Sequence, residues 1–250
     1  MPPRAYRELC ARFRAGLQAG LGDTLTSLYL YGAVTFPRPV DWLLDVDFHA
    51  LLSAPPTDGQ REAVAGLHRR LGEESPLGEE LDGYYILLSD AAGTTPPTSV
   101  AGAFPSTGPA LVTGPVDDAW ALHRAHVLAG RVVVLHGTDP RTILPSPTWS
   151  ELAEGLGSEL DFVQEHPEHA AFGVLNACRI AWSCAHRDVV VSKWASATWA
   201  AQHEPRWRRG IEAAVRQYTQ TPAPGDAGLL TAIRGEVLAR ARAALRDAAG

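Results

Sequence analysis

Two aspartates in the segment 43–52, Asp45 and Asp47, have the spacing that a metal site on a strand requires. Successive side chains of a strand point to opposite faces, so residues i and i+2 share one face. The two carboxylates are therefore expected to project side by side, while Val46 and Phe48 enter the core. Adjacent carboxylates repel each other unless a cation separates them. Hard oxygen ligands of this kind suit Mg²⁺, which keeps coordination positions for phosphate oxygens, and the pair predicts a magnesium site.

The surroundings of this aspartate pair decide between a metal site and an ordinary exposed strand. An Asp-x-Asp pair alone is most often an exposed strand or turn feature. Here the two acids lie inside a strongly apolar segment, where unpaired charge is expensive. The preceding apolar segment ends at Gly32, and a glycine lets the backbone approach a triphosphate closely. The connection from Gly32 to Asp45 is long enough to wrap a nucleotide between two neighbouring strands.

Periodic apolar residues predict the elements that position these side chains. In the first half the predicted strands are 25–31, 43–52, 81–88 and 131–135, and the predicted helices are 4–20, 57–71 and 117–128. Thr57 is a suitable N-cap for the second of these helices. The stretch 91–115 is rich in Gly, Pro, Ser and Thr, and we expect a long loop there: a lid, a substrate-facing segment or disorder.

The second half of the chain has a helical pattern throughout. The predicted helices are 148–165, 167–185, 192–203, 205–219 and 226–248. Pro167 and Pro205 lie where first-turn prolines belong, because the missing N–H has no helical partner there. The sequence therefore predicts an α+β protein with two domains. Residues 1–146 form a mixed β-sheet with flanking helices, and residues 147–250 form an all-α helical bundle.

Composition narrows the classes of partner. The chain has 250 residues and a formal net charge of -6, without a long run of one sign. A nucleic-acid or anionic-membrane binder would need a basic footprint, so neither partner is expected. No apolar run is long enough to cross a bilayer. The three cysteines, Cys10, Cys178 and Cys184, form no disulfide framework or zinc spacing. We expect a cytoplasmic protein that is a monomer or a weak homodimer.

Two segments resemble a known family. The segment 29–52, YLYGAVTFPRPVDWLLDVDFHALL, resembles the signature of the nucleotidyltransferase superfamily, a Gly-Ser turn followed by Asp-x-Asp on the next strand. The segments ACRIAWSCAHRDVVVSKWASATWAAQHEP and AAVRQYTQT resemble the helical domain of the aminoglycoside 3''/9 adenylyltransferases. The similarity runs from about residue 25 to residue 218 and is weakest between residues 90 and 116.

The resemblance implies a Mg²⁺-dependent transfer of AMP from ATP to a hydroxyl of a small molecule, in a cleft between the domains. The acceptor is expected to be an aminoglycoside-like antibiotic, which would make the protein a resistance enzyme, or another hydroxylated metabolite. Asp45 and Asp47 correspond to the magnesium ligands, and Asp82 falls where the family has a catalytic glutamate that accepts the proton of the attacking hydroxyl. The implied nucleotide-binding residues are Gly32, Ala33, Asp118, Arg179, Lys193 and Tyr218.

Several residues depart from the family pattern. Ala33 and Leu44 replace serines whose hydroxyls help to hold phosphate, and each lost hydrogen bond to a charged group costs roughly 1.5–3 kcal/mol. Thr35 is a candidate replacement for one of them. Asp82 is one methylene shorter than glutamate, so Glu80 is an alternative base. These changes leave a second hypothesis open: a non-catalytic relative that binds a nucleotide or metabolite without transfer.

The substrate side departs further. The family places an acidic residue just before the helix with the Arg-Ile pair, and the matching stretch here, HPEHAAF, offers Glu168 as the nearest carboxylate and His169 close to the expected position. Trp120, beside the predicted long loop, is a candidate ligand contact. His49 shares the strand face of Asp47 and is a candidate hydrogen-bond partner of a metal ligand.

Overall fold

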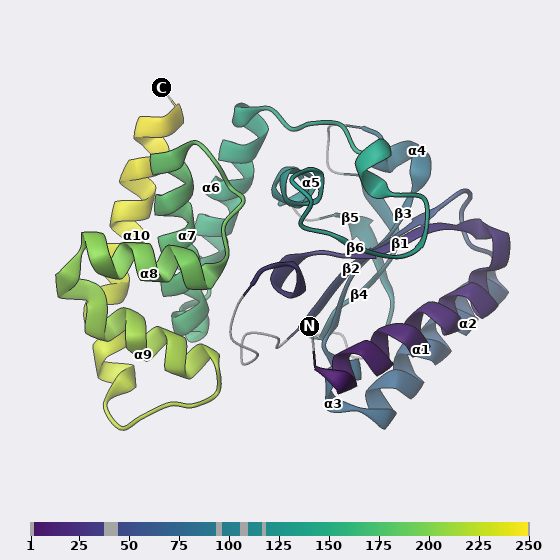
Figure 1. Cartoon of the computed structure of the whole chain (residues 1–250), viewed down its shortest axis with the longest axis horizontal. Coiled ribbons are helices and arrows are strands. Elements are labelled where there is room, and N and C mark those ends of the chain that lie inside the picture. The colour runs from purple at the N-terminus through teal and green to yellow at the C-terminus, as the bar shows by residue number, and fades with distance from the viewer. Residues whose placement is uncertain (1–2, 38–44, 94–96, 106–109, 117–118, 250) are drawn as a thin grey trace. The chain divides into compact units, whose positions relative to one another are not determined.

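The computed structural model describes residues 3–37, 45–93, 97–105, 110–116 and 119–249. The chain forms two compact units, Met1–Ser146 and Pro147–Gly250 (Figure 1). The first unit is a sheet flanked by helices and the second is helical, as the α+β prediction required. Among the described helices, none combines the length and the apolar character needed to cross a bilayer.

The described strands of the first unit form one six-stranded mixed sheet with the order β5-β4-β3-β2-β1-β6. The central strands β2 and β3 are parallel, and every other neighbouring pair is antiparallel. The strands are β1 (Leu25–Leu30), β2 (Val46–Leu52), β3 (Leu81–Leu87), β4 (Thr98–Ala103), β5 (Val112–Pro115) and β6 (Val133–Gly137).

Strands β4 and β5 correct the prediction of a long loop over 91–115. Strand β4 pairs with β3 although Val100 is its only larger apolar side chain, and the small Ala101 and Ala103 are buried in the core. At Gly102 the backbone passes close to a ring, and a Cβ there would lie 2.8 Å from Phe104. Small residues therefore fit a strand into a narrow space that the apolar pattern does not reveal.

Helices cover both faces of the sheet. The helical elements of the first unit are α1 (Arg4–Leu21), α2 (Asp58–Glu74), α3 (Pro76–Glu79), α4 (Leu88–Ala91) and α5 (Trp120–Leu128), with short 3-10 turns η1 (Gly22–Thr24), η2 (Gly32–Thr35) and η5 (Pro140–Thr142). The predicted N-cap Thr57 is confirmed. Its hydroxyl accepts from the Gln60 N–H at 3.3 Å, and the Gln60 side chain accepts from the Thr57 N–H at 2.9 Å.

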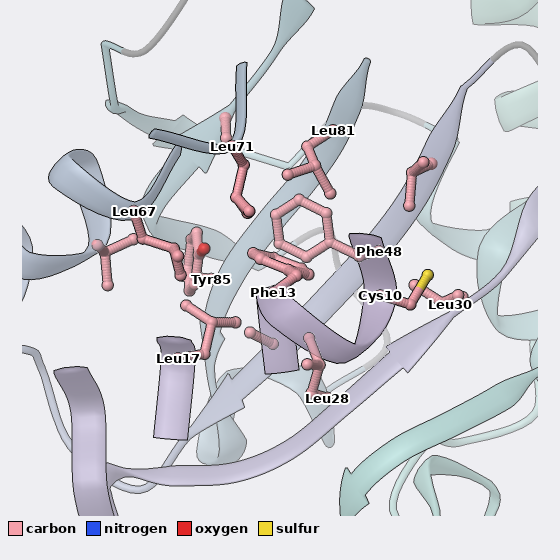
Figure 2. Packing of buried hydrophobic residues seen from close by; sticks show 14 of the residues in the cluster. Cys10, Phe13, Leu17, Leu28, Leu30, Phe48, Leu67, Leu71, Leu81 and Tyr85 are labelled. Atoms are coloured by element: carbon pink, nitrogen blue, oxygen red, sulfur yellow. The ribbon is translucent and has the colours of Figure 1, made fainter. Parts of the chain in front are cut away.

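Strand alternation separates two buried clusters. On one face, side chains of α1 and α2 pack against Phe48 and its neighbours, with the rings of Phe13 and Phe48 4.8 Å apart (Figure 2). On the other face, Tyr29, Leu51 and Trp120 belong to a second cluster, to which α5 contributes. The alternation predicted for β2 is confirmed, because Val46 and Phe48 enter the first cluster and the odd-numbered residues do not.

The second unit is a bundle around α7. Its helical elements are α6 (Trp149–Glu165), η6 (Pro167–His169), α7 (Ala170–His186), α8 (Lys193–His203), η7 (Pro205–Trp207), α9 (Arg208–Tyr218) and α10 (Asp226–Ala249). Helix α7 packs against α6, α8, α9 and α10 and buries Val174, Ala177 and Cys178. Pro167 and Pro205 each open a 3-10 turn that leads into the next helix.

Candidate functional site

Four carboxylates gather where β2 and β3 begin. Asp47 on β2 is the register partner of Asp82 on β3, and neighbouring strands lie about 4.8 Å apart. Asp45 directly precedes β2 and Glu80 directly precedes β3. The Val46 N–H donates to the Glu80 carbonyl at 2.9 Å, so the two strand starts are joined through the backbone. The parallel pairing thus brings together acids that are 35 positions apart in the sequence.

Several negatively charged side chains lie close together in this group of carboxylates. Burial, followed by the charges of Asp45 and Glu79, raises the pKa of Glu80 above its ordinary value. Asp45 is half-buried, and among the described residues its buried Oδ1 atom has no hydrogen-bond partner. A buried acceptor without a donor is costly. A cation or a ligand donor at this point would remove that cost.

The residues fit a magnesium ion that is held jointly with a nucleotide. Within the described part of the chain, no group of three or more His, Cys, Asp or Glu side chains could hold a metal by itself. Magnesium is ordinarily bound by one or two carboxylates, with water and substrate phosphates filling its remaining positions. Asp45 and Asp47 are two such carboxylates, and the buried Oδ1 of Asp45 lacks the partner that an ion would supply.

The turn η2 lies directly against Asp47. Gly32 has φ +63°, and a Cβ atom at this position would lie 1.8 Å from the Asp47 Oδ2 atom. The Tyr31 N–H donates to the Asp47 carbonyl at 3.1 Å. The Thr35 hydroxyl donates to the Gly32 carbonyl at 2.7 Å, so its proton closes the turn rather than pointing to a ligand. Glycine suits this position because a side chain would be strained at this φ and would collide with the Asp47 carboxylate.

Arg131 adds a positive charge beside this turn. Its Nη1 atom donates to the Thr35 carbonyl at 3.3 Å, and its guanidinium lies 4.7 Å from the centre of the Phe36 ring. In the sequence, position 131 is recognisable only as the first residue of a predicted strand. Nothing local links it to residue 35, which is 96 positions away, so only the fold reveals the contact.

The predicted roles of His49 and Trp120 need correction. Both side chains have 0% exposed surface. His49 Nδ1 lies 3.1 Å from the Tyr29 hydroxyl, and the rings of His49 and Trp120 are 5.3 Å apart. Helix α5 covers this part of the sheet face with buried side chains. The structure therefore places Trp120 in the core instead of at a ligand-facing surface, and pairs His49 with a tyrosine rather than with Asp47.

In the second unit, the predicted residues Lys193 and Tyr218 are brought together. Lys193 Nζ donates to the Tyr218 hydroxyl at 3.1 Å and lies 4.5 Å from the centre of the Phe172 ring. Arg179 forms an ion pair with Glu159, with 3.3 Å between Nη2 and Oε2. Lys193 begins α8 directly after its N-cap Ser192, whose hydroxyl accepts a backbone N–H, and this cap fixes where the lysine leaves the helix.

The remaining predicted residues are exposed or outside the described part of the chain. Glu168 and His169 lie in η6 with more than half of each side chain exposed, and His169 Nε2 is 3.9 Å from Glu168 Oε1. Asp118 and Leu44 lie outside the described residues.

The fold and the site define a class. This fold, a mixed sheet with two central parallel strands followed by a helical unit, is shared with a solved adenyltransferase. Among solved structures, the chain is similar to spectinomycin adenyltransferase AAD(9) from Enterococcus faecialis, whose crystal structure contains ATP and spectinomycin. The TM-score is 0.77 and the sequence identity 16%, over 94% of this chain and 99% of that chain. No protein-family model matches the sequence, and no curated protein matches it. At this identity the similarity establishes the fold.

Proposed function

We propose that this protein is a Mg²⁺-dependent nucleotidyltransferase that transfers AMP from ATP to a hydroxyl of a small molecule. The observation that carries the proposal is the register pairing of Asp47 with Asp82 beside the Gly32 turn. The shared fold supports it, since AAD(9) is an adenyltransferase whose structure contains ATP and spectinomycin.

In this proposal Asp45 and Asp47 hold the magnesium ion. The bound ion would neutralise phosphate charge and orient the triphosphate for in-line attack. The half-buried Asp45 offers an oxygen that accepts no hydrogen bond from any described residue. Gly32 adds no side chain of its own to the space beside the Asp47 carboxylate, which a Cβ at this position would enter. In this proposal the two aspartates therefore bind the magnesium ion and orient the triphosphate, and another group accepts the proton of the attacking hydroxyl.

Asp82 is the proposed general base, because it is the register partner of Asp47, the proposed metal ligand. A base within hydrogen-bond reach of the acceptor hydroxyl removes its proton as the new bond forms. Glu80 is the rival, since its raised pKa brings it nearer to neutral pH, where a general base works best. Comparing Asp82→Asn with Glu80→Gln at saturating substrate identifies the base, because only the loss of the true base abolishes turnover.

The helical unit is proposed to contribute positive charge to the nucleotide. Lys193 is a compact cation that the Tyr218 hydroxyl and the Phe172 ring hold in place, and such an ammonium suits phosphate oxygens. Arg179 is a second candidate, oriented by Glu159. Glu168, an exposed carboxylate with His169 beside it, is the candidate contact for an amine of the acceptor. An aminoglycoside acceptor would make the protein a resistance enzyme.

The test is pyrophosphate release from ATP and Mg²⁺ across a panel of aminoglycosides, aminocyclitols and simple sugars. Asp47→Asn should abolish release while the protein stays folded. Asp58→Asn is the matched control, because Asp58 is an exposed carboxylate in the first turn of α2, and it should leave release unchanged. Unchanged turnover in Asp47→Asn would contradict the metal assignment.

A second candidate function is nucleotide or metabolite binding without transfer. It is favoured by Ala33, which lacks the serine hydroxyl of the family, and by Thr35, whose hydroxyl donates to the Gly32 carbonyl. Titration with ATP in the presence and absence of Mg²⁺ separates the two. Metal-dependent binding without pyrophosphate release for any acceptor in the panel would favour this candidate over the enzyme.

A further inference from the structure

His49 lies among a group of aromatic rings on the face of β2 that also carries Asp47. Its ring stacks on Tyr31 at 4.4 Å between centroids with an interplanar angle of 27°. Its Nδ1 atom lies 3.1 Å from the Tyr29 hydroxyl. The other rings around it are those of Tyr84, Trp120 and His123, at 6.1, 5.3 and 5.3 Å. The side chain has no exposed surface, so it acts only through these neighbours.

Packing alone does not account for a histidine at this position. Among the described residues, His49 Nε2 has no hydrogen-bond partner, and a buried polar atom without a partner costs about 1–3 kcal/mol. Leu51, two residues further along the same strand face, is equally buried and apolar. An apolar side chain is therefore accommodated on this face of β2. The buried His49 Nε2 atom, which lacks a partner among the described residues, needs an explanation other than packing.

A short series of contacts connects His49 to Asp47. The Tyr31 ring packs against the rings of both His49 and His123, at 4.4 and 4.5 Å, and these two rings are 5.3 Å apart. The Tyr31 N–H donates to the Asp47 carbonyl at 3.1 Å. The next residue, Gly32, lies against the Asp47 carboxylate. A shift of the Tyr31 ring would therefore move the turn η2, which lies against the Asp47 carboxylate.

We infer that His49 is a positioning residue for the metal–nucleotide site: by fixing the Tyr31 ring, it holds the Gly32 turn against the Asp47 carboxylate. This inference rests on the proposed function, because it assumes that Asp47 binds the metal. It assigns His49 no contact with the metal, the nucleotide or the acceptor. A displacement of about 1 Å at a reacting group can cost on the order of a hundredfold in rate, so a small movement of this turn is sufficient.

The opposite face of the same sheet supplies a matched control. His68 on α2 is also buried, and its Nε2 atom lies 2.8 Å from the Tyr85 hydroxyl. Its ring packs against Phe13 and Phe48, in the cluster that the carboxylates do not face. His49 and His68 are thus two buried histidines, each paired with a tyrosine on β1 or β3, and only the first leads to Asp47.

The experiment compares His49→Leu and His68→Leu in the full chain. Calorimetry measures the affinity for a non-hydrolysable ATP analogue with and without Mg²⁺, and urea unfolding measures stability. We expect His49→Leu to weaken the Mg²⁺-dependent binding by about tenfold or more, and His68→Leu to change it less than about twofold. Tyr31→Leu should reproduce the effect of His49→Leu. The double variant should lose little more than either single one, because both act through one series of contacts.

Each outcome bears on a different claim. Wild-type affinity in His49→Leu, or equal weakening by His68→Leu, overturns the positioning role and leaves the proposed function standing. No Mg²⁺-dependent binding by the wild-type protein overturns the proposed function and this inference together. If His49→Leu does not fold, His49→Phe and Tyr31→Leu carry the test, and wild-type affinity in both overturns the inference.

Discussion

Replacement of Gly32 tests whether this glycine makes room for the Asp47 carboxylate. Gly32→Ala should damage the site more than the fold. Its φ of +63° is strained for alanine, and a residue forced into such a conformation costs on the order of 1–3 kcal/mol. The new Cβ would also lie 1.8 Å from Asp47 Oδ2, whereas real Cβ contacts are essentially never below 3.0 Å. The carboxylate oxygen must therefore move by about 1.2 Å or more.

The movement should be local to the carboxylate. The same Cβ would lie 3.2 Å from the Asp47 Cβ, which is tight but tolerable, so rotation of the Asp47 side chain relieves the clash without moving β2. A metal ligand displaced by about 1 Å is expected to lower activity by on the order of a hundredfold. Metal-dependent nucleotide affinity should fall with it.

Gly22→Ala is the matched control. Gly22 has a similar φ of +56°, but a Cβ there meets nothing within 4 Å. Urea unfolding and Mg²⁺-dependent calorimetry with an ATP analogue should give two results. Both variants lose stability, because both glycines have a positive φ that is strained for alanine, and only Gly32→Ala loses affinity. Equal affinity in the two variants would refute the claim that Gly32 makes room for the Asp47 carboxylate.

Two further predictions follow from the cation in the helical unit and from the buried histidine of α2. Lys193→Met should weaken nucleotide binding by about tenfold or more and Tyr218→Phe by less, because only the first removes the charge; equal calorimetric affinities for wild type and Lys193→Met would contradict it. Burial lowers the pKa of His68 to about 4 from 6.5. The unfolded chain therefore takes up a proton first as the pH falls, so stability is full above pH 6.5 and declines through that range to pH 4. The total loss is about 3 kcal/mol, of which about 2 kcal/mol is lost by pH 5. His68→Leu should remove this part of the decline, measured by urea unfolding at pH 7.5 and 5, and an unchanged decline would contradict the assignment.

The parts of the fold predicted from sequence are those with strong periodicity. The alternation of β2 correctly put Val46 and Phe48 in one core and Asp47 on the other face. Strands β4 and β5 were missed because their small residues carry no apolar pattern, and their place depends on pairing with β3. The local sequence pattern predicts which face of the sheet a side chain occupies, but it does not predict which distant strand pairs with its own strand.

The residues of the candidate site divide in the same way, into those that local spacing predicts and those that only the fold brings together. Asp45 and Asp47 could be found from spacing, since both the strand and the charge are local. The position of Asp82 beside Asp47 depends on a parallel pairing that spacing alone does not predict. Trp120 and His49 were misassigned because the sequence does not show how much of the sheet face α5 covers.

The gathering of Asp45, Asp47, Glu80 and Asp82 at two strand starts also affects the protein before any ligand arrives. Folding must bring these like charges together, and the pKa of Glu80 is raised first by burial and then by the neighbouring charges of Asp45 and Glu79. The clustering of these carboxylates therefore lowers the stability of the first unit, and in the proposed function a bound metal–nucleotide complex would offset this loss. By mass action, a ligand present at 100 times its Kd adds about 2.7 kcal/mol to the stability of the folded state. The lifetime of this protein in a cell would then depend on its nucleotide supply.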